Sequence, residues 1–268
     1  MIRAAASLAV VLLIGYALVL LMFRARPNRS AGLSFALSLG LGFGFLAEYC
    51  VLSLMLTRRI DFTFAYVASV LAAGGILYEK RKARSLNLLR LVPFSGVLRG
   101  KGHQKSPASQ KIMAGAAAII VAIIVFIVAF NLLARPMYHY DSRAIWGLKA
   151  KILFEERTIF SESVEDISRN HPHPRYPLLL PIASAWVFQN MGKADDRGVR
   201  LLFLAYFVGL ILAAYQLQRT HAGGTAAIVS VAALLSAPLL YAGMKSGGSS
   251  GHADIIVAFY ITMSVLAQ

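Results

Sequence analysis

The chain alternates between long apolar runs and short polar connections, and this pattern predicts helices that cross a membrane. Most of the runs approach or exceed the roughly 20 residues that a helix needs to cross the hydrocarbon core of a bilayer. We expect spans at Ala4–Phe23, Leu33–Leu56, Phe62–Leu77, Ile112–Leu133, Val199–Leu217 and Thr225–Tyr241. A last apolar run, Ile255–Gln268, is too short to cross, so we expect a C-terminally truncated chain that stops inside a helix.

The charged positions predict which side of the membrane each connection faces. The loop 79–111 is strongly basic, and cytoplasmic loops of membrane proteins carry an excess of lysine and arginine. We therefore place this loop in the cytoplasm and the chain in the inner membrane of a cell, as a multi-pass protein. The alternation of spans then puts the N-terminus and the long loop 134–198 on the extracytoplasmic side. Because basic loops are routine in membrane proteins, we expect no nucleic-acid partner.

Composition agrees with a membrane protein and excludes other classes. Hydrophobic residues make up 58% of the 268 residues and charged residues only 15%, against about 25% in soluble domains. These values exclude a soluble globular enzyme and a disordered chain, and the single cysteine, Cys50, excludes a disulfide scaffold. The net charge of +15 is first a topology signal in such a chain.

The same pattern divides the chain into three parts. A three-span bundle occupies residues 1–78, the basic loop follows at 79–111, and a second membrane core occupies 112–268. The predicted fold class is all-α, a polytopic transmembrane helix bundle with one long extracytoplasmic loop that bears juxtamembrane helices. In that loop Tyr176–Phe188 is apolar but too short to cross, so we expect an interfacial or re-entrant helix that lies on the membrane, with Tyr176 and Trp186 at headgroup level.

Most of the 12 acidic residues fall in the outer loop, as expected of a folded, water-facing segment in which chemistry takes place. Asp141 follows a span by only a few residues. A carboxylate at such a boundary can face a cavity in which desolvation keeps it reactive as a base. The alternative is an interfacial aspartate that pairs with Arg135 or Arg143.

Basic side chains of the same loop are candidates to bind an anion. Helical spacing would place Lys149 on one face with Ile145 and Ile152, where its ammonium can bind a lipid phosphate or snorkel to water. His171 and His173 lie in an extended, proline-rich segment and point the same way. They can bind a metal together, contact an anionic headgroup, or form a polar loop without further function.

Two more acids lie in or beside apolar segments. Glu48 falls inside the second expected span, where a buried acid usually pairs with another group or lines a cavity. Asp254 opens the last apolar run, where it can be a site residue or only a favourable charge at a helix N-terminus. If Tyr176–Phe188 did cross the membrane, Asp254 would face the cytoplasm instead.

Four features follow one another in the second half of the chain. They are Asp141 with Trp146 and Lys149-Ala150-Lys151 behind it, the segment Tyr176–Pro181, Gly192 ahead of Arg200-Leu201, and His252-Ala253-Asp254. In this order they resemble the N-terminal half of GT-C type glycosyltransferases, from about Lys111 to Gln268. The best likeness is to the branch related to protein mannosyltransferases and rhizobial lipopolysaccharide core transferases.

The resemblance implies transfer of a sugar from a polyprenyl-phosphate donor to an acceptor at the extracytoplasmic membrane face. Asp141 would be the general base or a metal ligand, and Asp254 the second acid of the same outer cavity. The cationic side chains that would neutralise the donor phosphate are Lys149, His171, His173 and Arg175. No cofactor is assigned; a divalent metal, if bound, would use Asp141, His252 and Asp254. The expected partners are the lipid-linked sugar and membrane lipid, with the acceptor unidentified.

Two other functions compete with an enzyme or the N-terminal part of one. The first is a non-catalytic transporter or flippase of lipid-linked sugars, and the second is a structural membrane protein whose loop binds a partner. A transporter is expected to place ionisable residues near the middle of the membrane. Here they concentrate in one outer loop and in boundary turns, which favours an enzyme that works at the membrane interface.

Overall fold

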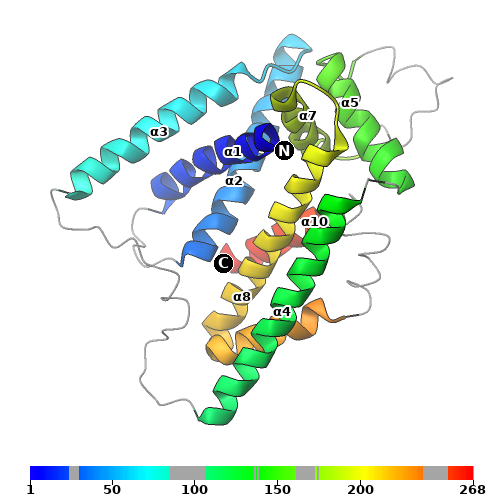
Figure 1. The fold of residues 1–268 in the computed structure, drawn as a ribbon. Coiled ribbons are helices and arrows are strands. Elements are labelled where there is room, and N and C mark those ends of the chain that lie inside the picture. The colour runs from blue at the N-terminus through cyan, green and yellow to red at the C-terminus, as the bar shows by residue number, and fades with distance from the viewer. Residues whose placement is uncertain are drawn as a thin grey trace.

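The computed structural model describes residues 1–23, 30–84, 107–135, 137, 139–160, 173, 175–237 and 253–267, without the side chains of 79–84 and 267. Within these ranges the chain forms helices and short connections and no strand, which confirms the predicted all-α bundle (Figure 1). The helices are α1 (Ile2–Met22), α2 (Ala31–Thr57), α3 (Thr63–Arg84), α4 (Ala108–Ala134), the π-helix η2 (Asp141–Gly147), α5 (Leu148–Glu155), α7 (Leu179–Met191), α8 (Asp196–Leu235) and α10 (Asp254–Ala267).

Helices α1, α2, α4 and α8 are long and apolar enough to cross a membrane, so the chain is a membrane protein. The apolar stretches Thr63–Tyr78 of α3 and Asp254–Leu266 of α10 are shorter. The expected spans Val199–Leu217 and Thr225–Tyr241 lie on either side of a kink within α8, the second as far as the structure describes it. The kink is at Gly223, whose φ of 81° is a conformation that glycine adopts without a steric penalty.

One end of the bundle gathers the beginnings of α1 and α8, the end of α4, and the short helices η2, α5 and α7; we call it the loop end (Figure 1). There the indole of Trp186 donates to a backbone carbonyl of α1 over 3.0 Å, and the Met137 amide donates to the Asp196 carboxylate over 3.0 Å. At the opposite end the Ser30 hydroxyl donates to the Gln216 side chain over 3.2 Å. The N-terminus and the outer loop therefore lie at the same end, as the predicted alternation of spans requires.

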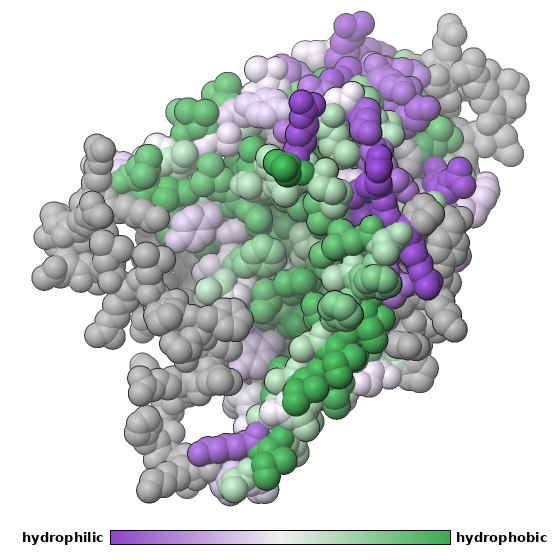
Figure 2. All heavy atoms as spheres, viewed as in Figure 1, coloured by the Kyte–Doolittle hydropathy of each residue, from purple (hydrophilic) through white to green (hydrophobic). Residues whose placement is uncertain are grey.

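Surface hydropathy separates the loop end from the helices that carry it. Figure 2 shows hydrophilic side chains gathered at the loop end and hydrophobic side chains along α4. Large apolar side chains of α4 are exposed, among them Ile119, Ile123, Phe126 and Phe130. A helix that exposes such side chains over several turns is suited to contact with lipid.

Helix α7 is buried in the protein. All residues from Leu180 to Phe188 are buried, and the Trp186 side chain is 0% exposed, so Trp186 is enclosed by protein, and its position at headgroup level stays a prediction. Its ring packs against the rings of Phe62 and Tyr66, with centroids 5.6 Å and 4.9 Å away. The physical reason is that α7 is apolar around its whole circumference, so it is stable only where other helices cover every face. With 13 residues α7 is too short to cross the membrane.

The N-terminal helices share one hydrophobic core with the rest of the described chain. Helices α1 and α2 cross at two glycines, where their backbones come into direct contact. A Cβ on Gly15 would overlap the Ser38 carbonyl oxygen, and a Cβ on Gly42 would overlap that of Val11. The crossing therefore requires glycine at both positions, and it holds α1 against the helices that form the loop end.

Candidate functional site

A cavity of about 730 Å³ lies at the loop end. Its walls come from η2, α5, α7, the turn before α8 and the first two turns of α8. The apolar side chains of the lining include Met137, Trp146, Leu180, Phe188 and Phe203. The volume lies within the roughly 300–1,000 Å³ that is typical of small-molecule sites, so the cavity can hold a ligand with a substantial apolar part.

The π-helix η2 forms one wall and begins with Asp141. Bonds from residue i to residue i+5 widen this helix, and they bring Gly147 so close to Ser142 that a Cβ on Gly147 would lie 2.7 Å from the Ser142 carbonyl oxygen. Such π turns are rare and frequently occur at functional sites. Ser142 and Arg143 line the cavity, whereas Asp141, half-buried, is not part of the lining. The structure thus places Asp141 next to the cavity wall.

Three cationic side chains line the cavity: Arg143, Lys151 and Lys193. All three keep contact with water; the side chains of Lys151 and Lys193 are 54% and 62% exposed. Lys151 approaches Glu155 only at 3.8 Å, an exposed pair that contributes little. Lys193 is paired with Asp195 at 3.0 Å, so Arg143 and Lys151 are the cations that can bind an anion from solution without first losing a strong ion pair in the described part of the chain.

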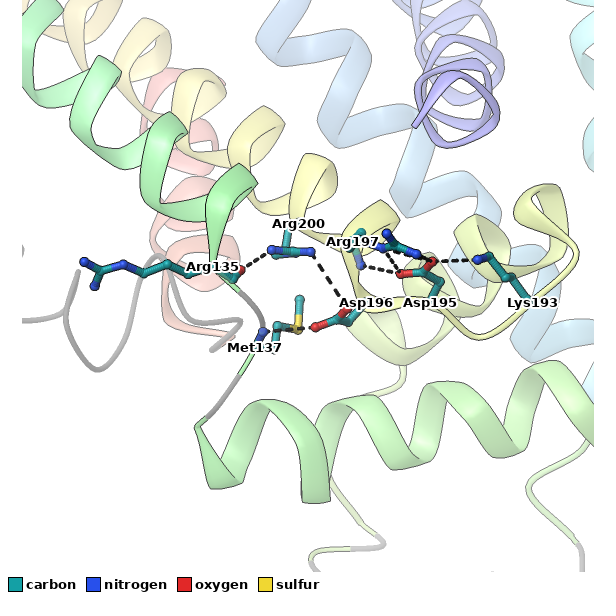
Figure 3. Close-up of polar contacts among 7 residues, drawn as sticks. All are labelled: Arg135, Met137, Lys193, Asp195, Asp196, Arg197 and Arg200. Carbon is teal, nitrogen blue, oxygen red and sulfur yellow. Dashed lines mark hydrogen bonds and ion pairs between the residues drawn. The ribbon is translucent and has the colours of Figure 1, made fainter.

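Two neighbouring acids, Asp195 and Asp196, also line the cavity (Figure 3). They differ in how many close hydrogen bonds their carboxylates accept from the protein. Asp195 is the N-cap of α8 and accepts four hydrogen bonds from Arg197 at 2.8–3.2 Å as well as the Lys193 ammonium at 3.0 Å. The Arg197 hydrogen bonds, followed by the one from Lys193, hold the pKa of Asp195 well below its usual range. Asp195 is thus an ionised structural residue.

Asp196 is held differently, by a network that joins the end of α4 to the start of α8. One carboxylate oxygen, Oδ2, accepts the Met137 amide at 3.0 Å, while Oδ1 faces the Arg200 guanidinium at 3.9 Å. Arg200 also donates to the carbonyl of Arg135. Its side chain is only 5% exposed, and its Nε–H is buried without a hydrogen-bond partner in the described part of the chain. The side chain of Asp196 stays 41% exposed.

Lys149 is placed away from the cavity lining. It lies on the inward face with Ile145 and Ile152, as the helical spacing predicts, and is 3% exposed. Its ammonium donates to the backbone carbonyls of His173 at 3.0 Å and Tyr176 at 3.3 Å. Burial lowers the pKa of this ammonium. The structure thus brings Lys149 and His173 together, but the contact is between the Lys149 ammonium and the His173 backbone carbonyl and does not involve the His173 ring.

The remaining predicted site residues are not part of the cavity lining. The His173 ring stacks on the Tyr176 ring with centroids 4.4 Å apart, and Arg175 is exposed beside it. Asp254 is exposed at the first residue of α10. The shared cavity expected for Asp141 and Asp254 stays a prediction. His171 and His252 lie outside the described residues.

Six charged residues in the lining or directly behind it are not among the predicted site residues: Arg143, Lys151, Lys193, Asp195, Asp196 and Arg200. The segment 193–200 carries a signal that could have indicated four of them, because five charged residues cluster directly before an apolar span. Charges that crowd the outer end of a span are candidates to line an interfacial site. The sequence predicts Arg143 only as an ion-pair partner of Asp141.

The described residues contain no group of three histidine, cysteine or acidic side chains that could hold a metal ion. A metal site formed by Asp141, His252 and Asp254 stays a prediction, because His252 lies outside the described residues. Comparisons of the chain with protein-family models, with curated proteins and with solved structures found no match. The functional argument therefore depends on the residues and the geometry of the cavity.

Proposed function

We propose that this chain is a glycosyltransferase of the inner membrane, or the N-terminal part of one. It would move a sugar from a polyprenyl-phosphate donor to an acceptor at the extracytoplasmic face. The observation that carries the proposal is the cavity at the loop end, which combines apolar walls with Arg143, Lys151 and Lys193. A polyprenyl-phosphate sugar has the matching parts, namely an apolar chain, one phosphate and a polar sugar.

The cavity cations are suited to the leaving phosphate of such a donor. An arginine binds phosphate oxygens through two parallel hydrogen bonds, and a lysine adds a compact positive charge. Negative charge builds up on the phosphate as the bond to the sugar breaks, so cations held at that position lower the barrier. We assign this role to Arg143 and Lys151. Lys149 is the weaker candidate, because its ammonium already binds two backbone carbonyls.

Asp141 is the proposed general base that takes the proton of the acceptor hydroxyl. It begins η2 and directly precedes Ser142 and Arg143, which line the cavity. An acceptor bound at that wall would lie beside both the base and the cation that holds the phosphate. Loss of a general base typically lowers a rate by about 10²–10⁴.

The test uses proteoliposomes or isolated membranes that contain the full chain and undecaprenyl phosphate esters of radiolabelled glucose, mannose and galactose. The measured quantity is the label that leaves the donor and enters another lipid or a polymer. Asp141→Asn should lower this transfer by about 10²–10⁴ without reducing the amount of protein in the membrane. Transfer by the Asp141→Asn variant at the wild-type rate would refute the role of the base.

A matched control also separates the enzyme from a transporter. Glu48 is exposed on α2, away from the cavity lining, and Glu48→Gln makes the same change from carboxylate to amide. An enzyme should keep its transfer rate in Glu48→Gln. If Glu48→Gln instead abolishes movement of the labelled lipid across the bilayer and Asp141→Asn does not, the chain is a transporter.

A further inference from the structure

The two acids of the cavity differ in a way that has a consequence for ligand binding. Both oxygens of Asp195 accept close hydrogen bonds from Arg197, and one of them also binds Lys193. Asp196 has one close bond, from the Met137 amide to Oδ2. In the described part of the chain, Oδ1 of Asp196 meets only Arg200, at 3.9 Å. That distance exceeds the roughly 2.7–2.9 Å of a charge-assisted hydrogen bond, so Oδ1 keeps room for another donor.

We infer that Asp196 binds hydroxyl groups of the donor sugar and so fixes the orientation of the donor in the cavity; this inference rests on the proposed glycosyltransferase function. A carboxylate accepts hydrogen bonds from hydroxyls and repels a phosphate. Arg143 and Lys151 belong to the η2–α5 wall, whereas Asp196 belongs to α8. The third cation of the lining, Lys193, lies before α8 but is paired with Asp195 at 3.0 Å. A ligand with a phosphate at one point and hydroxyls at another therefore fits this cavity best with its phosphate at the η2–α5 wall.

The network behind Asp196 keeps its carboxylate in place. The Met137 amide and the Arg200 guanidinium approach different oxygens of Asp196, and Arg200 is anchored to the Arg135 carbonyl on the other side (Figure 3). A carboxylate that is held in this way needs little reordering when a sugar binds, and such preorganisation favours affinity. Arg200 is therefore a positioning residue and does not itself contact the sugar.

The experiment compares two lipid probes on the full chain in detergent or nanodiscs. The first probe is undecaprenyl phosphate, and the second is whichever of its glucose, mannose and galactose esters binds the wild type most tightly. Asp196→Asn should weaken binding of the ester about 10-fold or more, as expected for the loss of a hydrogen bond to a charged group. Binding of the bare undecaprenyl phosphate should stay within about twofold, because that lipid has no sugar hydroxyls for Asp196 to bind.

The neighbouring acid provides the matched control. Asp195→Asn removes a cap from α8 and should lower thermal stability, but it should not change the ratio of the two affinities. Asp196→Glu, which keeps the charge, should recover part of the preference for the ester. These variants separate contact with the sugar from a merely structural role of the acidic pair.

Three results would contradict the inference, and they are distinguishable. If Asp196→Asn weakens both probes equally, Asp196 supports the fold and does not contact the sugar. If the wild type binds all sugar esters no better than the bare lipid, no sugar site exists at Asp196. If the wild type binds neither kind of lipid, the proposed function fails and this inference with it.

Discussion

Replacing Lys149 with methionine tests the arrangement of the loop around His173. In the structure the Lys149 ammonium donates to the carbonyls of His173 and Tyr176 at 3.0 Å and 3.3 Å. Lys149→Met keeps an apolar side chain of similar length in a position that is 3% exposed and removes only the ammonium. The loop would then lose both hydrogen bonds while the packing of α5 stays the same.

The expected magnitude is modest because two effects oppose each other. A hydrogen bond to a charged group contributes about 1.5–3 kcal/mol to stability, and Lys149 donates two such bonds to the described residues His173 and Tyr176. Burial of the ammonium offsets part of this gain, as the lowered pKa of Lys149 indicates. His173 and Tyr176 are exposed, so water can replace the lost donor at their carbonyls. We expect a net loss of about 1.4 kcal/mol, which raises the population of the open loop about tenfold.

Trypsin cleavage after Arg175 measures that population. Arg175 is exposed between the two carbonyls that Lys149 holds, but a protease requires the surrounding backbone to open. When opening and closing are fast, the cleavage rate follows the population of the open form. Lys149→Met should therefore be cut after Arg175 about ten times faster than the wild type. Lys151→Met, on the same helix but 54% exposed, is the control and should leave this rate unchanged.

The pH dependence gives a second measurement on the wild type. Because burial lowers the pKa of Lys149 below its usual 10.5, the open form binds more protons than the closed form between the two pKa values. The closed loop should therefore become more stable as the pH rises through this interval towards 10.5, and Lys149→Met should lack this dependence. Equal cleavage of Lys149→Met and the wild type would refute the argument, because the loop would then be held by other contacts such as the ring stacking of His173 on Tyr176.

Two further predictions concern the fold and its orientation. Gly15→Ala should lower stability by about 1–3 kcal/mol, because the new Cβ would force α1 away from α2. The control Gly44→Ala, which places its Cβ in open space, should be neutral or stabilising. Thermal unfolding in detergent compares the two variants, and equal unfolding temperatures would contradict the crossing. Cysteines at Ser163 and Ser95, in an otherwise cysteine-free chain, should react with an impermeant thiol reagent from opposite sides of the membrane, and reaction from one side would refute the predicted topology.

The sequence predicts those parts of the fold that depend on the local pattern of a single helix. Runs of apolar residues identified the long helices, and the spacing of Ile145, Lys149 and Ile152 predicted a shared face that is indeed buried. Burial of Trp186 was not predictable in this way. It depends on packing against Phe62 and Tyr66, more than a hundred positions earlier, and no local pattern in α7 indicates that contact.

The candidate site was predictable in location but not in composition. Most of the residues that line the cavity lie in the segment 134–198, which the distribution of charges indicates as the place of the chemistry. The sequence could not show that Lys149 turns inward to backbone carbonyls while Lys151, two residues later, faces the cavity. Nor could it distinguish the capping role of Asp195 from the more open position of Asp196. Asp196 binds the Met137 amide, which comes from a distant segment, whereas Asp195 binds the nearby Arg197.

The contact between α1 and the loop end has a practical consequence for engineering this protein. The backbone of Ser7 accepts the Trp186 indole, and a Cβ on Gly198 would lie 3.2 Å from the Ala4 side chain. The first two turns of the first helix therefore touch both α7 and the part of α8 that follows Asp196. Exchanging this helix for another apolar helix would remove these contacts and distort the cavity. An inactive chimera of that kind would report on damaged architecture and not on missing chemistry.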